Sequence, residues 1–171
     1  FDDGYQNVLL NAAPVLKKYN FSATCYIVSE SIGSSNTWDL KYGVTQRPLM
    51  TEIEINKWLK LGMDIGAHTK THADLTAIPK MKAKIEISDC KSSLEKIFKV
   101  EINDFCYPFG RFNDEVATMV QDSGYLTATS MNRGRVNFKS NSYALPRIPI
   151  NHRTLFHLFL LKIFTKYEDR R

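Results

Sequence analysis

Short apolar runs alternate with longer amphipathic stretches along this chain, and the alternation predicts strands and helices in turn. The expected strands are residues 23–28, 63–67, 104–107, 125–130 and 144–150. The first run is β-branched and aromatic, and it is apolar enough to be buried on both faces, which is typical of a parallel sheet. The last run contains two prolines, so we predict extended chain there rather than helix.

The expected helices are marked by residues that favour helix ends. They cover residues 5–19, 51–62, 79–99, 114–122 and 154–167. Thr51 and Glu54 have the spacing of a capping box, Pro79 suits a first helical turn, and Asn113 is a good N-cap. Pro14 likewise suits a first turn and interrupts the earliest helix. The strongly apolar last helix is expected to dock on the rest of the fold or on chain outside this sequence.

Strands and helices that alternate without an internal repeat or a linker predict one α/β unit, which we extend over residues 1–171. The composition is that of an ordinary globular domain, with 43% apolar and 24% charged residues. The net charge of +5 is compatible with an anionic polymer or envelope surface, although a solvated basic face is the commoner reason. No nucleic-acid motif is present, so nucleic acid is not an expected partner.

Three cysteines without CxxC spacing do not make a disulfide framework. No secretory leader and no membrane-spanning apolar run are visible. Because Phe1 opens inside a motif, we expect the natural chain to continue upstream and the first strand to be truncated here. The missing leader therefore says nothing about location.

Four residues carry the most specific chemical signal. His68 and His72 are four residues apart, and if they share a helical turn their rings can reach one metal ion. The alternative is two histidines that happen to fall in a polar loop. Asp2 and Asp3 follow the expected end of a strand, so one could complete a His, His, Asp ligand set while the other acts on water held by the ion. Spacing alone does not say which aspartate does what.

Three separated motifs resemble those of the polysaccharide deacetylase family, the carbohydrate esterases with a NodB homology domain. They are residues 1–4 (FDDG), 68–72 (HTKTH) and 106–110 (CYPFG). The resemblance implies a distorted (β/α) barrel of the NodB type, with the site at the C-terminal ends of its strands. It also implies Asp3, His68 and His72 as metal ligands and Asp2 as the catalytic base. Zinc is the expected metal, and Co²⁺, Ni²⁺ or Mn²⁺ would accept the same ligands.

The resemblance further implies a substrate-binding turn at Tyr107, Pro108 and Phe109, where a backbone N–H near Tyr107 would stabilise the oxyanion. Cys106 stands where the family usually has an arginine that orients the base. We hypothesise that Arg147 supplies the guanidinium, the alternative being an ordinary surface or structural ion pair.

For the catalytic acid, the family uses a histidine near the end of the domain. His152 is the better candidate and His157 the worse, although His152 could equally be a surface residue. The loop at residues 29–50 is long enough to be functional. Its Trp38 and Tyr42 could stack on a sugar ring or simply anchor the loop to the core.

These features favour a metal-dependent hydrolase that removes N-acetyl groups, or O-acetyl groups as the second choice, from a cell-envelope or exported polysaccharide. An N-acetylated glycan is the expected partner. The resemblance places the protein in the envelope or outside the cytoplasm, with peripheral association as one option. Two alternatives stay open: a glycan-binding module of the same fold that has lost turnover, and an amidase acting on a small non-sugar amide.

Overall fold

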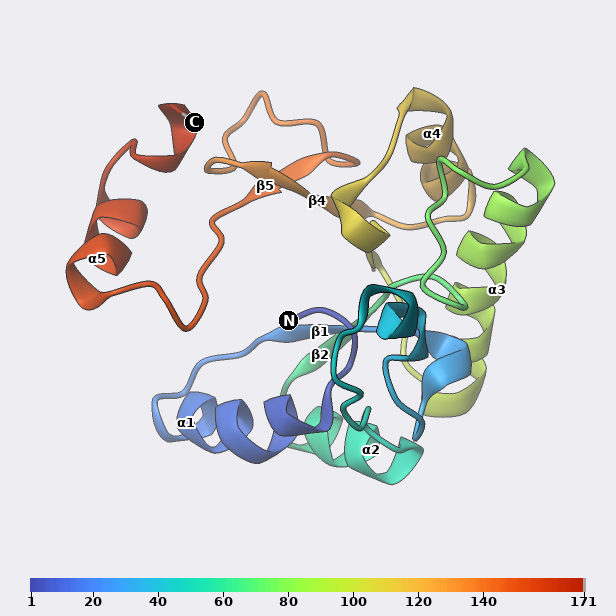
Figure 1. Ribbon diagram of the computed structural model, residues 1–171, viewed down its shortest axis with the longest axis horizontal. Helices are drawn as coiled ribbons and strands as arrows, with labels where there is room; N and C mark the ends of the chain where they lie inside the picture. The colour runs from blue at the N-terminus through green and yellow to red at the C-terminus, as the bar shows by residue number, and fades with distance from the viewer. Residues whose placement is uncertain (171) are drawn as a thin grey trace.

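The computed structural model describes residues 1–170, with side chains through residue 169. Within that range it shows a parallel sheet whose strands are adjacent in the order in which they occur in the sequence (Figure 1). The strands are β1 (Thr24–Ile27), β2 (Asp64–Ala67), β3 (Asp104–Cys106), β4 (Thr127–Arg133) and β5 (Leu145–Arg147). All four neighbouring pairs are parallel. The chain therefore winds in one direction, as in a (β/α) barrel, and the predicted fold is confirmed.

Phe1 pairs with β1 through backbone hydrogen bonds at the start of the chain. Its N-terminal nitrogen donates to the Thr24 carbonyl at 2.9 Å, and its carbonyl accepts the Tyr26 N–H at 2.8 Å. Phe1 thus lies along the edge of β1 that β2 leaves free. The two aspartates that follow Phe1 are carried to the carboxyl end of the sheet, where the loops after β2 and β3 also emerge.

Five α-helices connect or flank the strands within the described residues: α1 (Ala13–Lys18), α2 (Glu52–Lys60), α3 (Lys80–Phe98), α4 (Asp114–Asp122) and α5 (Phe156–Phe164). A π-helical turn, η1 (Val8–Ala12), precedes α1, and the helix becomes regular where Pro14 occupies its first turn. The described part of the chain also contains four short 3₁₀ segments: η2 (Ser29–Ser31), η3 (Thr37–Tyr42), η4 (Pro108–Gly110) and η5 (Glu168–Arg170).

The predicted helix starts are confirmed by their contacts. Thr51 and Glu54 make both bonds of a capping box at α2. The Asn113 side chain accepts the Val116 N–H at 2.9 Å at the start of α4. Pro79 is the N-cap of α3, where its missing N–H leaves no bond unmade.

The core lies between the sheet and helices α2, α3 and α4. Trp58 from α2 and Leu94 from α3 are fully buried, as is Phe105 on β3. The Trp58 indole also donates to the Asp64 carbonyl at 2.7 Å, which fastens α2 to the start of β2. Each large apolar side chain buried in this way stabilises the fold by about 1.5–3 kcal/mol, so the strands that carry the site rest on a rigid base.

The fourth strand differs from its predicted range of residues 125–130. The structure begins β4 at Thr127 and continues it to Arg133, because a register shift lets it pair with β5 twice, at Thr129 with Leu145 and at Arg133 with Arg147. The register shift that produces the second pairing is not visible in the local pattern.

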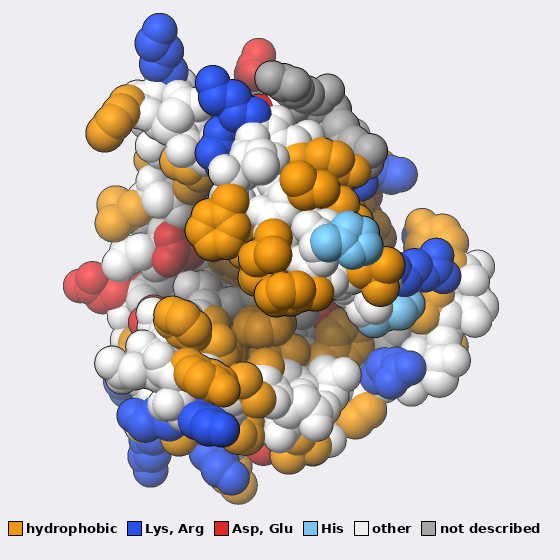
Figure 2. Space-filling view, turned by 90° about the vertical axis from the view of Figure 1, so that its left-hand side faces the viewer, with side chains coloured by type: hydrophobic (Ala, Val, Ile, Leu, Met, Phe, Trp, Pro, Cys, Tyr) orange, Lys and Arg blue, Asp and Glu red, His pale blue; other side chains and the backbone are white. Residues whose placement is uncertain are grey.

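Helix α5 stands at one side of the molecule (Figure 1), and the face that includes it shows many apolar side chains (Figure 2). Its buried residue is Lys162, whose ammonium donates to the Pro149 carbonyl at 2.7 Å and pairs with Glu168 at 2.5 Å. Phe156 and Phe164 are 74% and 75% exposed. Leu158 and Phe159 are partly buried, so α5 docks on the rest of the fold only in part, with Lys162 as its buried residue. Among the described residues, no helix is both long and apolar enough to cross a membrane.

Candidate active site

Asp2 and Asp3 occupy a tight turn at the carboxyl end of the sheet. Asp3 and Gly4 both have left-handed backbones, with φ of 72° and 77°. A Cβ at Gly4 would lie 3.1 Å from Ile27 Cδ1, so glycine satisfies both the conformation and the close approach. The sharp reversal presents the two neighbouring carboxylates in one pocket.

The two histidines follow β2, but the segment between them is not the helical turn that would have explained their spacing. Residues 69–72 contain no helix, and Thr69 and His72 have left-handed φ values of 62° and 61°. Such values are uncommon for residues with a side chain, and they gather at functional sites. Both rings still converge, so the predicted proximity is right although its reason is different.

Glu86 on α3 accepts hydrogen bonds from the backbone N–H groups between the two histidines, which in a helix would bond to backbone carbonyls. Its Oε2 accepts the N–H groups of Lys70 and Thr71 at 2.9 and 2.8 Å. Its Oε1 accepts the Thr71 hydroxyl at 2.7 Å. The Glu86 side chain is buried, and it therefore fixes the backbone between the two histidines.

Two imidazole nitrogens converge on one carboxylate oxygen. His68 Nε2 lies 3.2 Å and His72 Nε2 lies 3.3 Å from Asp3 Oδ1. His68 Nδ1 lies 2.7 Å from the Cys106 carbonyl, which can only accept, so Nδ1 carries the proton and Nε2 has a free lone pair. Three electron-rich atoms so close together need a shared cation or proton. The donor set therefore fits a divalent metal ion with nitrogen and oxygen ligands, and the three ligand atoms lie within 4.8 Å of one another.

Titration of Asp3 and His68 reflects this pairing. Burial raises the pKa of Asp3, but hydrogen bonds from His68 and His72 outweigh it and hold that pKa well below its usual value. Burial lowers the pKa of His68, yet neighbouring Cys106 and Asp3 raise it well above its usual value. A metal ion and protons would therefore compete for the same ligand atoms.

Asp2 is held by Arg147. Arg147 Nη1 and Nη2 donate to the two carboxylate oxygens of Asp2 at 2.7 and 2.9 Å, and Nε donates to the Ser130 carbonyl at 2.9 Å. Burial raises the pKa of Asp2, but the hydrogen bonds from Arg147 outweigh it, so the net pKa is lowered. The thiol of Cys106 is fully buried. The guanidinium that contacts Asp2 therefore comes from Arg147 on β5 and not from the position of Cys106.

The turn after β3 contributes Tyr107 and Phe109 to the pocket. The Tyr107 hydroxyl donates to the Tyr143 carbonyl at 2.8 Å, and its backbone N–H donates to the Thr129 carbonyl at 3.2 Å. Both groups are therefore engaged in the fold. Pro108 is buried at the start of η4 and leads to Phe109, whose left-handed φ of 58° turns the chain toward His72.

These side chains surround a cavity of about 200 Å³, lined by Asp2, Asp3, Trp38, Asp39, His68, His72, Tyr107, Phe109, Met131 and Arg147. Asp39, Met131 and Glu86 were not predicted from the sequence. Met131 could have been suspected because it directly follows the predicted strand 125–130, whereas the role of Glu86 leaves no signal in the local pattern.

His152 lies elsewhere. It is exposed on the turn between β5 and α5, and His157 is exposed on α5. In the part of the chain that the structure describes, neither histidine lines the cavity around Asp2. The assignment of His152 as catalytic acid stays a prediction.

The fold and site together define an α/β barrel-type domain with a candidate Asp-His-His metal centre and an arginine-bound aspartate at its strand ends. The sequence model of the polysaccharide deacetylase family matches residues 1–128, and the chain belongs to this family.

Two relatives show how far the similarity extends. YxkH of Bacillus subtilis (strain 168) is 28% identical over 151 residues, covering 88% of this chain and 50% of the relative. The poly-beta-1,6-N-acetyl-D-glucosamine N-deacetylase of Staphylococcus aureus (strain MRSA252) is 28% identical over 167 residues, covering 92% and 55%. This chain spans about half the length of the curated relatives it matches.

Solved structures agree on the fold. BC0361, a polysaccharide deacetylase from Bacillus cereus, superposes with a TM-score of 0.80 at 27% identity, over 95% of this chain and 49% of that one. The Streptococcus pyogenes deacetylase PplD gives a TM-score of 0.81 at 24% identity, over 95% and 68%.

Proposed function

We propose that this chain is a metal-dependent hydrolase that removes N-acetyl groups from a polysaccharide. The observation that carries the proposal is the convergence of His68 Nε2 and His72 Nε2 on Asp3 Oδ1, at 3.2 and 3.3 Å, beside the carboxylate of Asp2. Family membership supports deacetylation, and the name of the Staphylococcus aureus relative supports N-acetyl over O-acetyl groups.

Asp3, His68 and His72 would hold the ion, with zinc as our first choice from the ligand types and Co²⁺, Ni²⁺ or Mn²⁺ as alternatives. A divalent cation at that position polarises a carbonyl and makes nearby water more acidic. His68 is kept in the ligating tautomer by the Cys106 carbonyl.

Asp2 is the base in this proposal. Its carboxylate lines the same cavity as the ligand set, and each oxygen keeps a lone pair beyond its bond to Arg147. Arg147 keeps Asp2 ionised and fixes its orientation, which general-base catalysis requires. The arginine thereby takes the role that Cys106 cannot fill.

The remaining duties are an oxyanion donor and an acid. Because the Tyr107 N–H is bonded to Thr129, we place the donor at the backbone N–H of Phe109, which lines the cavity. The acid must protonate the leaving nitrogen, and His152 remains our candidate despite its distance from the described cavity. A His152→Gln variant that keeps the wild-type kcat and its alkaline pH limb would remove it from the mechanism.

We further propose an envelope or exported glycan as substrate, with the protein outside the cytoplasm or peripherally bound to the envelope. The support is the resemblance alone. Recovery of all the native protein in the cytoplasmic fraction of its own cells would contradict it.

A glycan-binding module of the same fold is the competing proposal, because Cys106 stands where the family usually has its arginine. An amidase for small substrates is a second, since the catalytic cavity alone measures only about 200 Å³. Acetate release from N-acetylglucosamine oligomers, measured with wild-type and Asp2→Asn proteins, separates the three. A deacetylase releases acetate only in the wild type. A module binds the oligomer without release, and a small-amide amidase hydrolyses simple acetamides but not oligomers.

A further inference from the structure

A second cavity adjoins the catalytic one beside Arg147, and we call it the Arg147-side cavity. Its volume is about 460 Å³, and it is lined by Phe1, Asp2, Met131, Arg147, Ile148, Pro149 and Ile150. Asp2, Met131 and Arg147 also line the catalytic cavity of about 200 Å³. A group bound beside Asp2 can therefore extend along Met131 into this second space.

Apolar side chains form most of the Arg147-side cavity, and several of them are open to solvent. Met131 is 65% exposed, and Phe1 and Ile150 are each 49% exposed. Met131 packs directly on the backbone of Gly110, because a Cβ added at Gly110 would clash with its side chain. Exposed apolar surface beside a reaction centre is stabilised when an apolar group covers it.

The polar groups at the Arg147-side cavity are already paired. Arg147 Nη1 and Nη2 donate to the carboxylate of Asp2 at 2.7 and 2.9 Å, and Nε donates to the Ser130 carbonyl at 2.9 Å. The Pro149 carbonyl accepts the Lys162 ammonium at 2.7 Å. The positive charge of Arg147 is thus balanced by Asp2. Because burial of an unpaired polar group costs free energy, this lining favours an uncharged alkyl chain.

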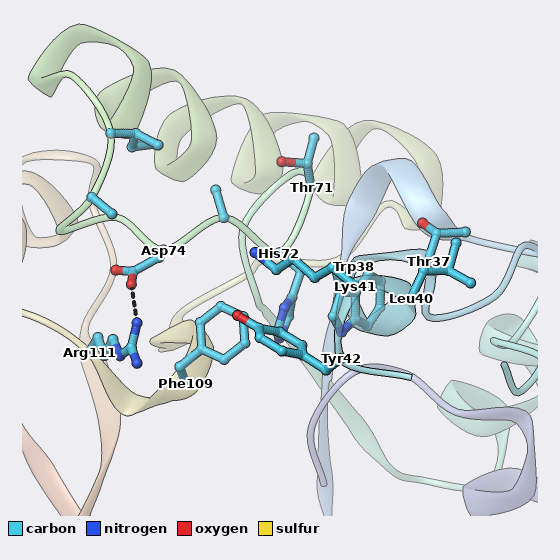
Figure 3. A pocket seen from close by; sticks show the side chains of 13 residues that line it. Thr37, Trp38, Leu40, Lys41, Tyr42, Thr71, His72, Asp74, Phe109 and Arg111 are labelled. Carbon is cyan, nitrogen blue, oxygen red and sulfur yellow. Dashed lines mark hydrogen bonds and ion pairs between the residues drawn. The ribbon is translucent and has the colours of Figure 1, made fainter. Parts of the chain in front are cut away.

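The opposite end of the catalytic cavity is aromatic and polar. Trp38 and Phe109 lie beside the His72 imidazole there, with ring centroids 4.4 and 4.7 Å from it (Figure 3). Farther out, Arg111 Nη1 donates to Asp74 Oδ2 at 2.6 Å (Figure 3). An amide carries an acyl chain on one side of its carbonyl group and an amine on the other. The end with polar side chains suits the hydroxyl-bearing amine of a sugar, so the apolar end is left for the acyl chain.

We propose that the Arg147-side cavity binds the acyl chain of the substrate, and that the enzyme hydrolyses N-acyl groups longer than acetyl, such as propionyl and butyryl. The inference rests on the proposed function, because it uses the same catalytic groups. Water adds to the carbonyl carbon and the C–N bond breaks. The oxygen of the water stays on the released carboxylate, which keeps the whole acyl chain, and the two protons of the water end on the nitrogen as an ammonium group.

The length of the acyl chain determines the size of the effect. Each methylene group that moves from water into an apolar cavity is worth about fourfold in a binding constant or in kcat/KM. An N-propionyl substrate should therefore exceed the N-acetyl substrate about fourfold, and an N-butyryl substrate should exceed it about fifteenfold. The N-glycolyl group is a matched control, because it has the size of propionyl but ends in a hydroxyl group.

The first measurement is kcat/KM for carboxylate release from glucosamine oligomers that carry N-acetyl, N-propionyl or N-butyryl groups. A butyryl-to-acetyl ratio of one or less in the wild-type protein would overturn the proposal. Ile150→Trp fills the Arg147-side cavity and should reduce that ratio to near one. Ile53→Trp is the control, since Ile53 is 82% exposed on α2, away from both cavities, and should leave the ratio unchanged. A ratio that is the same in both variants would also overturn the proposal.

The second measurement is calorimetric binding of the same oligomers, and of the N-glycolyl oligomer, to zinc-loaded Asp2→Asn protein. We expect the N-propionyl oligomer to bind about fourfold more tightly than the N-glycolyl one, and Ile150→Trp to abolish the difference. That result supports the acyl cavity even if the wild-type protein releases no carboxylate, in which case only the proposed function fails. Equal binding of the two oligomers would refute the acyl cavity even if acetate is released.

Discussion

Replacing Glu86 with alanine tests whether α3 holds the metal-ligand turn in place. The side chain makes three hydrogen bonds of 2.7 to 2.9 Å to Lys70 and Thr71, and each bond to a charged acceptor contributes about 1.5–3 kcal/mol. Because Thr71 is exposed and Lys70 half-buried, water replaces part of these bonds in the variant. We expect a net loss close to one bond, and a change of about 1.4–2.8 kcal/mol corresponds to 10–100-fold in Kd. That range also applies to other residues that support metal ligands.

The assay is the Zn²⁺ Kd, measured by competition with a chromophoric chelator. Glu86→Gln should lie between wild type and Glu86→Ala, because the amide oxygen still accepts both backbone N–H groups and the amide nitrogen can donate to the Thr71 hydroxyl. Glu95→Ala is the matched control, since Glu95 is on the same helix but accepts the Ile102 N–H at 3.2 Å, away from the site. Unchanged zinc affinity in Glu86→Ala, or an equal loss in Glu95→Ala, would refute the reasoning.

Three further predictions follow from the contacts. Arg147→Lys removes the bidentate hydrogen bond to Asp2, so the pKa of Asp2 should rise. We then expect kcat to fall about tenfold and the acid limb of the pH profile to move to higher pH. An acid limb that does not move would count against Asp2 as the base. Gly66→Ala would place a Cβ 2.5 Å from the Tyr26 ring and should destabilise the fold by about 1–3 kcal/mol. Gly43→Ala meets open space and should cost about 1–2 kcal/mol through its φ of 68° alone. Gly66→Ala should therefore have the lower Tm of the two in thermal unfolding. Chelation of the metal should lower Tm, and zinc at one hundred times its Kd should restore about 2.7 kcal/mol of unfolding free energy; an unchanged Tm would indicate that the folded protein binds no ion.

The sequence was most informative where a local signal decides the structure. The capping box at Thr51 and the N-cap at Asn113 each depend on residues within one turn of one another, and both appear as expected. Pro79 also marks the start of its helix, as the N-cap rather than as a residue of the predicted first turn. The order of strands and helices also follows from local periodicity, which was sufficient for the α/β class, whereas the barrel form was implied by the family resemblance.

Features that depend on distant partners could not be derived from the local pattern. The turn that carries His68 and His72 is non-helical because Glu86, on the next helix, takes up its N–H groups. Arg147 was only a hypothesis from sequence, since its bonds to Asp2 join residues 145 positions apart. Contacts of this kind arise only when the sheet brings the ends of the chain together.

The central claim is that Asp3, His68 and His72 bind one ion and that hydrolysis depends on it. The most direct measurement is a titration of metal-stripped protein with Zn²⁺, recording acetate release from N-acetylglucosamine oligomers beside His68→Ala and Asp2→Asn. We predict that release rises from near zero to a plateau at one zinc per chain. His68→Ala should fail to bind the ion tightly, whereas Asp2→Asn should bind it without turnover. Release that is indifferent to zinc, or undiminished in both variants, would contradict this.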